Sequence, residues 1–396
     1  MVIERNKMAK GIIAFEEEAL PTAPTEENQI DAEAAANEAQ TAVDNAGIAE
    51  DKDRISEAVG VQDAVSKIAT QVDNSITAGT GISDQTAAIL EVSVEHFCKR
   101  LGYSKQVVPS MEGFKDAVGR LEQSRIALEN LQELNAKLTK NISIAQEGFF
   151  ARIGNAFVRL FTTTNKMLRT LEASRNLVAS EEHLIKDPAW GRIFFSTKKF
   201  SLTGEDVISL MEDINDLNHN RIIPLTKRIT ELFSEAIAQV NRSTYIANDD
   251  AVRKINLMIN DSYALRKEVE EMVTVEVVEE SIDVLSASTD QIHRLCDIAT
   301  RSIRDNQKSY QFYELLNKVD DSYHQIEKNR KNRLLTIFTK HEKNPNGSDA
   351  ADIVAYHRML EAGAIAAVDL LRALNEAEYK IAYGAYKYIK ASIQKD

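Results

Sequence analysis

The side chains best suited to chemistry are three aspartate–histidine pairs with the spacing Asp-x-x-His. Residues three apart share one face of a helix, and carboxylate–histidine pairs from facing helices build metal sites in some helical bundles. Those sites use Glu-x-x-His together with inward glutamates, whereas an isolated Asp/His pair is ordinarily a weak surface interaction. We therefore expect no metal and no cofactor, and keep a metal-dependent helical enzyme as an alternative hypothesis. The pairs are Asp216/His219, Asp290/His293 and Asp321/His324.

The remaining reactive groups indicate no catalytic site. Cys98 and Cys296 lie far apart without CxxC spacing, so neither a disulfide nor a zinc site is predicted. Cys98 stands among apolar residues at helical spacing, which is typical of a core thiol rather than a nucleophile. The phosphate-binding, dinucleotide-binding, zinc-protease and esterase motifs do not occur. The sequence therefore predicts a protein that is not an enzyme and has no catalytic residues.

Composition predicts an all-α protein. The 396 residues include only 15 Gly and 6 Pro, and Ala, Leu, Ile, Glu and Lys are plentiful, which favours long helices and few turns. We expect long antiparallel helices in an elongated, coiled-coil-like bundle. One short strand is expected within residues 192–202, a helix kink at Pro224, and a final helix from Asp349 to Ile393 that packs antiparallel to its predecessor.

The acidity of the chain is confined to its first quarter. Residues 1–95 hold 19 acidic and 6 basic side chains, which accounts for the whole net charge of -13. This segment has few large apolar side chains, so we expect it to be disordered or loosely helical and to be separable from the rest. Three regions are predicted: an acidic segment or propeptide at 1–95, a helical region at 96–200, and a long-helix bundle at 201–396.

Residues 148–171 form the most amphipathic stretch of the sequence. Its charged side is purely basic, and the opposite side is apolar and rich in phenylalanine. Such a helix can face the core of a helical domain, or it can lie against a membrane or an anionic partner. The apolar stripe comprises Phe149, Phe150, Ile153, Phe157, Leu160 and Phe161, and the basic face comprises Arg152, Arg159, Lys166 and Arg169.

A second basic cluster lies near the end of the chain. A charge run on a helix is usually a solvated face, and the neutral balance after residue 95 argues against a dedicated nucleic-acid binder. Weak, non-specific DNA contact remains compatible with the cluster. It comprises Lys328, Arg330, Lys331 and Arg333.

Two short motifs carry a resemblance to a known family. Phe97-Cys98-Lys99-Arg100-Leu101-Gly102 is followed by Pro109-Ser110-Met111-Glu112-Gly113-Phe114, between an acidic low-complexity segment and a long helical body. This arrangement resembles the internal head (inner body) proteins of phiKZ-like jumbo bacteriophages over residues 90–170. The resemblance implies a virion protein made in the host cytoplasm, packed in the capsid interior with the genome, and ejected into the host with the DNA.

The resemblance also implies removal of a propeptide by a prohead protease that cuts after small-x-Glu. Ser93-Val94-Glu95 fits this pattern where the charge imbalance ends, so we expect cleavage there. The expected partners are other phage head proteins, the prohead protease and further copies of the chain. An alternative function is that of a membrane-active protein resembling pore-forming toxins. Other matches to the cleavage pattern end at Glu16, Glu38, Glu112, Glu129 and Glu147.

Overall fold

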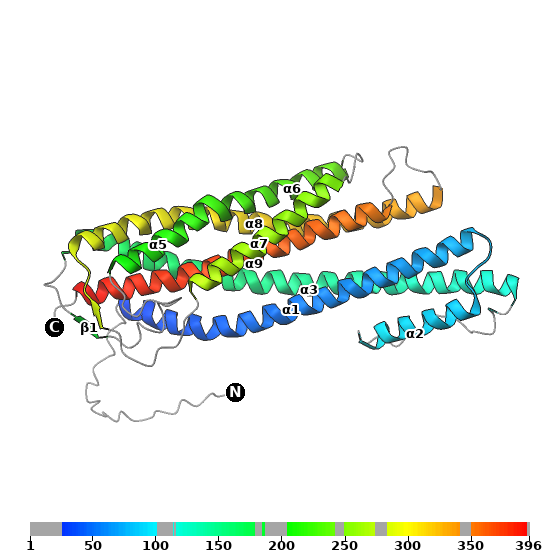
Figure 1. Cartoon of the computed structure of the whole chain (residues 1–396), viewed down its shortest axis with the longest axis horizontal. Helices are drawn as coiled ribbons and strands as arrows, with labels where there is room; N and C mark the ends of the chain where they lie inside the picture. The colour runs from blue at the N-terminus through cyan, green and yellow to red at the C-terminus, as the bar shows by residue number, and fades with distance from the viewer. Residues whose placement is uncertain are drawn as a thin grey trace, which may run out of the picture.

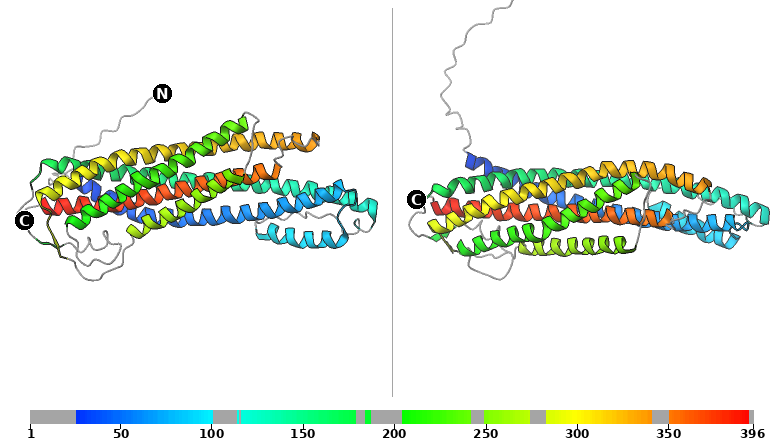
Figure 2. Two further views of the ribbon diagram at one scale, coloured as in Figure 1. Left: turned by 45° about the horizontal axis from the view of Figure 1, so that its top comes forward. Right: turned by 90° about the horizontal axis from the view of Figure 1, so that it is seen from above.

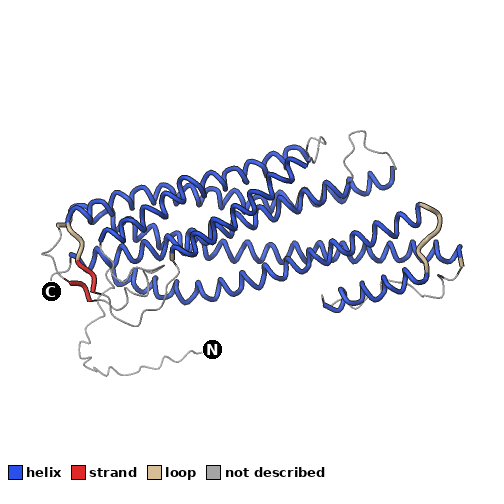
Figure 3. Tube along the Cα trace, viewed as in Figure 1, coloured by secondary structure: helices blue, strands red, loops and turns tan. Residues whose placement is uncertain are grey.

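A computed structural model shows the chain as a long, narrow bundle of helices that run roughly along one axis (Figure 1). It describes residues 26–100, 114, 116–178, 184–186, 204–241, 249–273, 283–340 and 350–393. Nearly all of this described backbone is helical, as the colouring of Figure 3 shows. The predicted all-α class and antiparallel arrangement of long helices are confirmed.

The first half of the bundle is a long antiparallel pair of helices. α1 (Glu26–Thr77) lies beside α3 (Ala117–Ala173) and runs in the opposite direction, and the views in Figures 1 and 2 agree on this. The short helix α2 (Asp84–Arg100) folds back against one end of the pair. The turn between α1 and α2 needs glycine, because Gly81 has a φ of 63° and an added Cβ would lie 2.8 Å from the Arg120 carbonyl oxygen.

The structure corrects the expectation of a disordered or loosely helical N-terminal segment over the range of α1. Ala, Glu and Gln give this segment high helix propensity. Its few large apolar side chains recur at helical spacing and pack on α3, which supplies the bulky partners. A sparse stripe is therefore enough to dock the helix. The large apolar residues that α1 buries include Ile30, Ile48, Ile55, Val65 and Val72.

The second half of the bundle contains five more α-helices within the described residues. α8 and α9 run antiparallel, as predicted (Figure 1). The expected break at Pro224 takes the form of one π-helical turn directly before it, because proline cannot donate the hydrogen bond of a regular helix. The elements are α5 (Gly204–Leu217), the π turn η3 (Asn218–Ile222), α6 (Ile223–Asn241), α7 (Asp249–Met272), α8 (Thr289–Lys340) and α9 (Ala350–Ile393).

Two three-residue strands close one end of the bundle. A short 3-10 turn, η2 (Ser174–Asn176), follows α3. β1 (Leu184–Lys186) then pairs antiparallel with β2 (Asp283–Leu285), so that Leu184 lies opposite Leu285. The strand expected within residues 192–202 lies outside the described residues.

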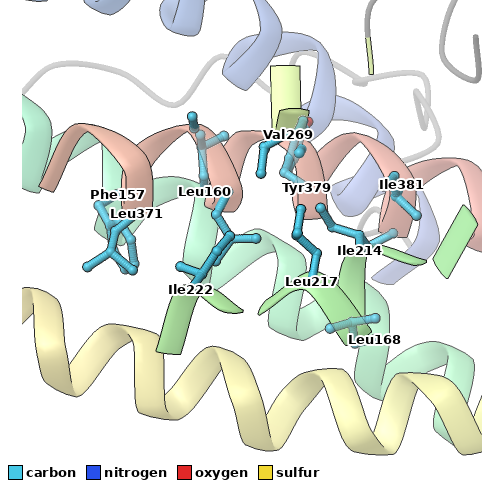
Figure 4. Packing of buried hydrophobic residues seen from close by; sticks show 14 of the residues in the cluster. Phe157, Leu160, Leu168, Ile214, Leu217, Ile222, Val269, Leu371, Tyr379 and Ile381 are labelled. Atoms are coloured by element: carbon cyan, nitrogen blue, oxygen red, sulfur yellow. The ribbon is translucent and has the colours of Figure 1, made fainter. Parts of the chain in front are cut away.

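α9 forms the centre of the main core. It is buried on nearly all sides between residues 360 and 389, and its many alanines let the neighbouring helices approach closely. Figure 4 shows side chains from α3, α5, η3, α7 and α9 meeting in this core. A smaller core at the far end joins α1, α2 and α3 around Phe114 and Leu131. Buried apolar side chains therefore line the bundle from the main core around α9 to the smaller core at α2.

Candidate functional site

A row of ion pairs joins the acidic helix α1 to the basic face of α3. The three basic residues stand seven apart, which is about two helical turns, so they line one side of α3. Because the two helices are antiparallel, their acidic partners follow in the reverse order along α1. Part of the acidic excess of the N-terminal segment therefore forms ion pairs with α3 within the folded chain. The pairs are Arg152 Nε–Asp51 Oδ2 (3.0 Å), Arg159 Nη2–Asp44 Oδ2 (2.9 Å) and Lys166 Nζ–Glu33 Oε1 (2.7 Å).

Further polar contacts fix the register of α1 on the bundle. Asn37 Nδ2 donates a buried hydrogen bond of 3.0 Å to Thr163 Oγ1 of α3. Tyr379 of α9 donates its hydroxyl to the Ala34 carbonyl oxygen at 3.1 Å. Partly exposed ion pairs contribute only about 0–1 kcal/mol each. The docking of α1 therefore combines many small contributions rather than one dominant contact.

One buried carboxylate, Asp369 of α9, links three helices. Its side chain is 2% exposed and accepts from Lys52 Nζ of α1 at 3.3 Å and from Arg372 Nε of α9 at 3.3 Å. It also pairs with Arg266 of α7. A buried charge is tolerated only when it is paired, and Asp369 meets this condition with three cations. The cluster anchors the middle of α1 to α7 and α9.

The apolar stripe of α3 faces the interior of the bundle. All of its members except Phe161 are buried, and Phe161 is half-buried. Phe157 stacks on Tyr313 of α8 with ring centroids 4.7 Å apart and planes 7° apart. In this fold the stripe therefore faces the core of the bundle, and it is not exposed to a membrane. The other members of the stripe are Phe149, Phe150, Ile153 and Leu160.

The two Asp-x-x-His pairs whose side chains are described, Asp216/His219 and Asp290/His293, do not converge on one site. His219 contacts Asp305 of α8 at 3.2 Å, rather than acting as one half of a site with Asp216. Asp290 and His293 are exposed near the start of α8, and the side chains of Asp321 and His324 lie outside the described part of the chain. Among the described residues, no group of three His, Cys, Asp or Glu side chains is placed to hold a metal ion.

A buried polar cluster surrounds Glu378 of α9, close to the π turn. Asn218 Nδ2 donates to Glu378 Oε1 at 3.0 Å, and Ser309 Oγ donates to Asn218 Oδ1 at 3.2 Å. With its amide nitrogen turned toward Glu378, Asn306 donates to Oε1 at 2.8 Å. Burial raises the pKa of Glu378 to about 8; the bond from Asn218 opposes this rise, and the negative charge of Asp305 adds to it. Glu378 is therefore mostly protonated at neutral pH.

Sequence reasoning did not find this cluster. Glu378 lies in an Ala/Glu/Tyr/Lys-rich stretch that is typical of a solvated helix face, so nothing in its own surroundings marks it as buried. The available signal was indirect. Asn215 and Asn218 precede the Pro224 break at positions where the helical pattern buries side chains, and a buried amide group needs a polar partner.

Both cysteines are expected to resist thiol reagents in the native protein. Cys296 is fully buried and its Sγ donates to the Leu171 carbonyl oxygen at 2.9 Å. Burial raises the pKa of the Cys296 thiol to about 11 and also raises that of Cys98, so little thiolate forms. Labelling with a chromogenic disulfide should stay near zero until denaturant is added, when two equivalents react. Rapid labelling of either thiol in the folded protein would contradict this.

The remaining predicted sites lie on helices. Ser93, Val94 and Glu95 fall within α2, where Val94 is buried and Glu95 is exposed. Arg169 is exposed and extends the basic row of α3. The basic cluster Lys328, Arg330, Lys331 and Arg333 lies on α8, with side chains outside the described part.

Comparison with known proteins gives one match. A family model described as phiKZ-like phage internal head proteins matches residues 25–234, just over half of the chain. The match runs from the start of α1 through most of α6. No curated protein and no solved structure matches the chain. No helix in the described part of the chain combines the length and apolarity that crossing a membrane requires.

Proposed function

We propose that this chain, which belongs to the phiKZ-like phage internal head proteins, is a non-enzymatic structural protein packed beside the genome in the capsid interior. The match across α1 to α6 carries this proposal, because it spans the whole α1/α3 pair and continues into the second half of the bundle. The fold supports it, since both cysteines are buried in the core and the aromatic stripe of α3 packs inside the bundle.

The proposal includes maturation by cleavage after Glu95. Proteases act most readily on locally unfolded chain, and the scissile segment is helical with Val94 only 1% exposed. α2 lies at one end of the bundle and packs on the smaller core alone. It can therefore unwind without disturbing the main core around α9. Cleavage there separates α1 covalently from α3 while their ion pairs remain in place.

The intact mass and N-terminal sequence of the chain from mature particles test this proposal. A chain that begins at His96 is expected. A chain that begins at Glu17 would instead place the cut after Ala14-Phe15-Glu16 and leave α1 covalently joined to α3 in the mature chain. An unprocessed chain would contradict maturation, and absence of the chain from purified particles would contradict the location.

We propose further that the protein enters the host with the DNA. Its long, narrow shape supports this, because a helical rod presents a small cross-section along its axis (Figure 2). Particles carrying labelled protein should transfer the label to cells before viral synthesis begins. Label that stays with the emptied particles would contradict delivery.

A further inference from the structure

We infer that the basic row of α3 is a binding surface for the phosphate backbone of DNA, and that α1 is an acidic helix competing for the same surface. We define the basic row as Arg152, Arg159, Lys166 and Arg169. The biological role of this binding surface rests on the proposed location of the protein beside the genome. Its chemistry rests on the contacts between α1 and α3.

The basic row has the arrangement that a phosphate backbone recognises. Arg152, Arg159 and Lys166 repeat at seven residues, which places the charges roughly 10 Å apart along one side of a straight helix. Arginine and lysine are the usual partners of phosphate oxygens, and such contacts need no base sequence. Arg159 is also incompletely used in this fold, since its Nε is buried without a hydrogen-bond partner. The row therefore retains donor capacity that α1 does not satisfy.

The carboxylates of α1 pair with three cations of the basic row, but α1 carries little negative charge per unit length. Glu33, Asp44 and Asp51 supply one carboxylate for each of three cations along the helix. Duplex DNA carries one negative charge per about 1.7 Å and releases condensed counterions when a protein neutralises them. The acidic helix offers a far lower charge density, and its partly exposed pairs contribute about 1 kcal/mol or less each. At low salt, phosphate groups of DNA therefore compete for these cations more strongly than the carboxylates of α1 do.

The stripe on α3 argues against a membrane as the partner. A helix that lies in a lipid interface buries its aromatic face in the bilayer. On α3 that face is already used, because Phe157 stacks on Tyr313 of α8 and its carbonyl oxygen accepts from Asn375 of α9 at 2.9 Å. Releasing α1 frees the charged row and leaves these contacts to α8 and α9 in place. The surface made available therefore combines the cations of the row with the α3 positions on which the apolar side chains of α1 pack.

The test compares two triple variants that make the same change in net charge. Glu33→Gln/Asp44→Asn/Asp51→Asn removes the carboxylates that face α3. The matched control, Glu38→Gln/Glu50→Gln/Asp53→Asn, neutralises exposed acids of α1 that the ion pairs to α3 do not use. Affinity for a short labelled DNA duplex is measured by fluorescence anisotropy at low salt, with the full chain. The first triple should bind roughly tenfold more tightly than the control, which corresponds to partial loss of three weak pairs.

A further set of substitutions and a second measurement keep the inference falsifiable. Adding Arg152→Gln/Arg159→Gln/Lys166→Gln to the first triple should abolish its gain. In the unmodified chain, saturating DNA should speed amide hydrogen exchange in α1 and leave α9 unchanged, which needs no variant to fold. Equal affinity of the two triples, or α1 exchange that does not respond to DNA, would overturn the inference. Binding to anionic vesicles but not to DNA would replace DNA by a membrane. None of these results bears on whether the chain is found in particles.

Discussion

Replacing Glu378 with glutamine is expected to stabilise the protein at neutral and mildly alkaline pH and to remove part of its pH dependence. Burial raises the pKa of Glu378 to about 8, whereas a glutamate in the unfolded chain titrates near its ordinary value of 4.5. Glutamine has nearly the same shape: its carbonyl oxygen can accept from Asn218, and its amide can donate to the Asn306 oxygen once the Asn306 amide group rotates by half a turn. The variant thus keeps the hydrogen bonds and removes the cost of a buried ionisable group.

The sign of the effect follows from proton binding. Between pH 4.5 and about 8, the folded state holds a proton on Glu378 and the unfolded state does not. The folded state binds more protons in this window, so stability falls as the pH rises by about 1.4 kcal/mol per unit. At pH 7 the accumulated difference between wild type and Glu378→Gln is roughly 3 kcal/mol in favour of the variant. Near pH 4 the two proteins should be almost equally stable.

Urea denaturation of the wild type and Glu378→Gln at a series of pH values measures this difference directly. Glu376→Gln is the matched control, because Glu376 lies two residues away on α9 and pairs with Arg372 and Lys380. Removing that carboxylate breaks ion pairs and should destabilise the protein rather than stabilise it. If Glu378→Gln and the wild type unfold at the same urea concentration at pH 8, Glu378 is not held protonated by the fold.

The fold was predictable from sequence at the level of class and helix order. The low Gly and Pro content indicates long helices, and Pro224 marks the position of the π turn. The state of residues 26–77 was not predictable from their composition. Composition measures how much apolar surface a segment carries, whereas α1 is ordered because α3 brings large side chains to a few of its positions, such as Ile48 and Ile55.

The sequence identified the charged residues of the interface between α1 and α3 but not how they pair. The basic face of α3 and the acidity of the N-terminal segment were both identified from residue types and spacing. Their pairing was not, because the partner of each charge depends on the register between two antiparallel helices. That register is set by distant contacts, such as Asn37 with Thr163 and Lys52 with Asp369, which no local pattern encodes. Opposite charges separated by 101 to 133 residues therefore form one interface only in the folded chain.

Replacing Phe157 with alanine is expected to destabilise the protein by about 3–5 kcal/mol, the usual cost of removing a large core aromatic. Phe157 lies where α3, α8 and α9 meet: its ring stacks on Tyr313 of α8, and its carbonyl oxygen accepts from Asn375 of α9 at 2.9 Å. Alanine leaves a cavity between α3, α8 and α9, and these long packed helices cannot move together far enough to fill it. The loss is measured as the shift in denaturation midpoint, converted with the slope of the unfolding transition.

The neighbouring residue supplies the control. Val158 follows on the same helix and is 44% exposed, so Val158→Ala should change stability by only a few tenths of a kcal/mol. A membrane-facing stripe requires the opposite pattern, since Phe157→Ala would then weaken vesicle binding and leave stability unchanged. A large loss of stability for Phe157→Ala alone is the result expected of a core residue. That outcome would also separate the two faces of α3, because the apolar face would then be committed to folding and only the basic row would remain for a partner.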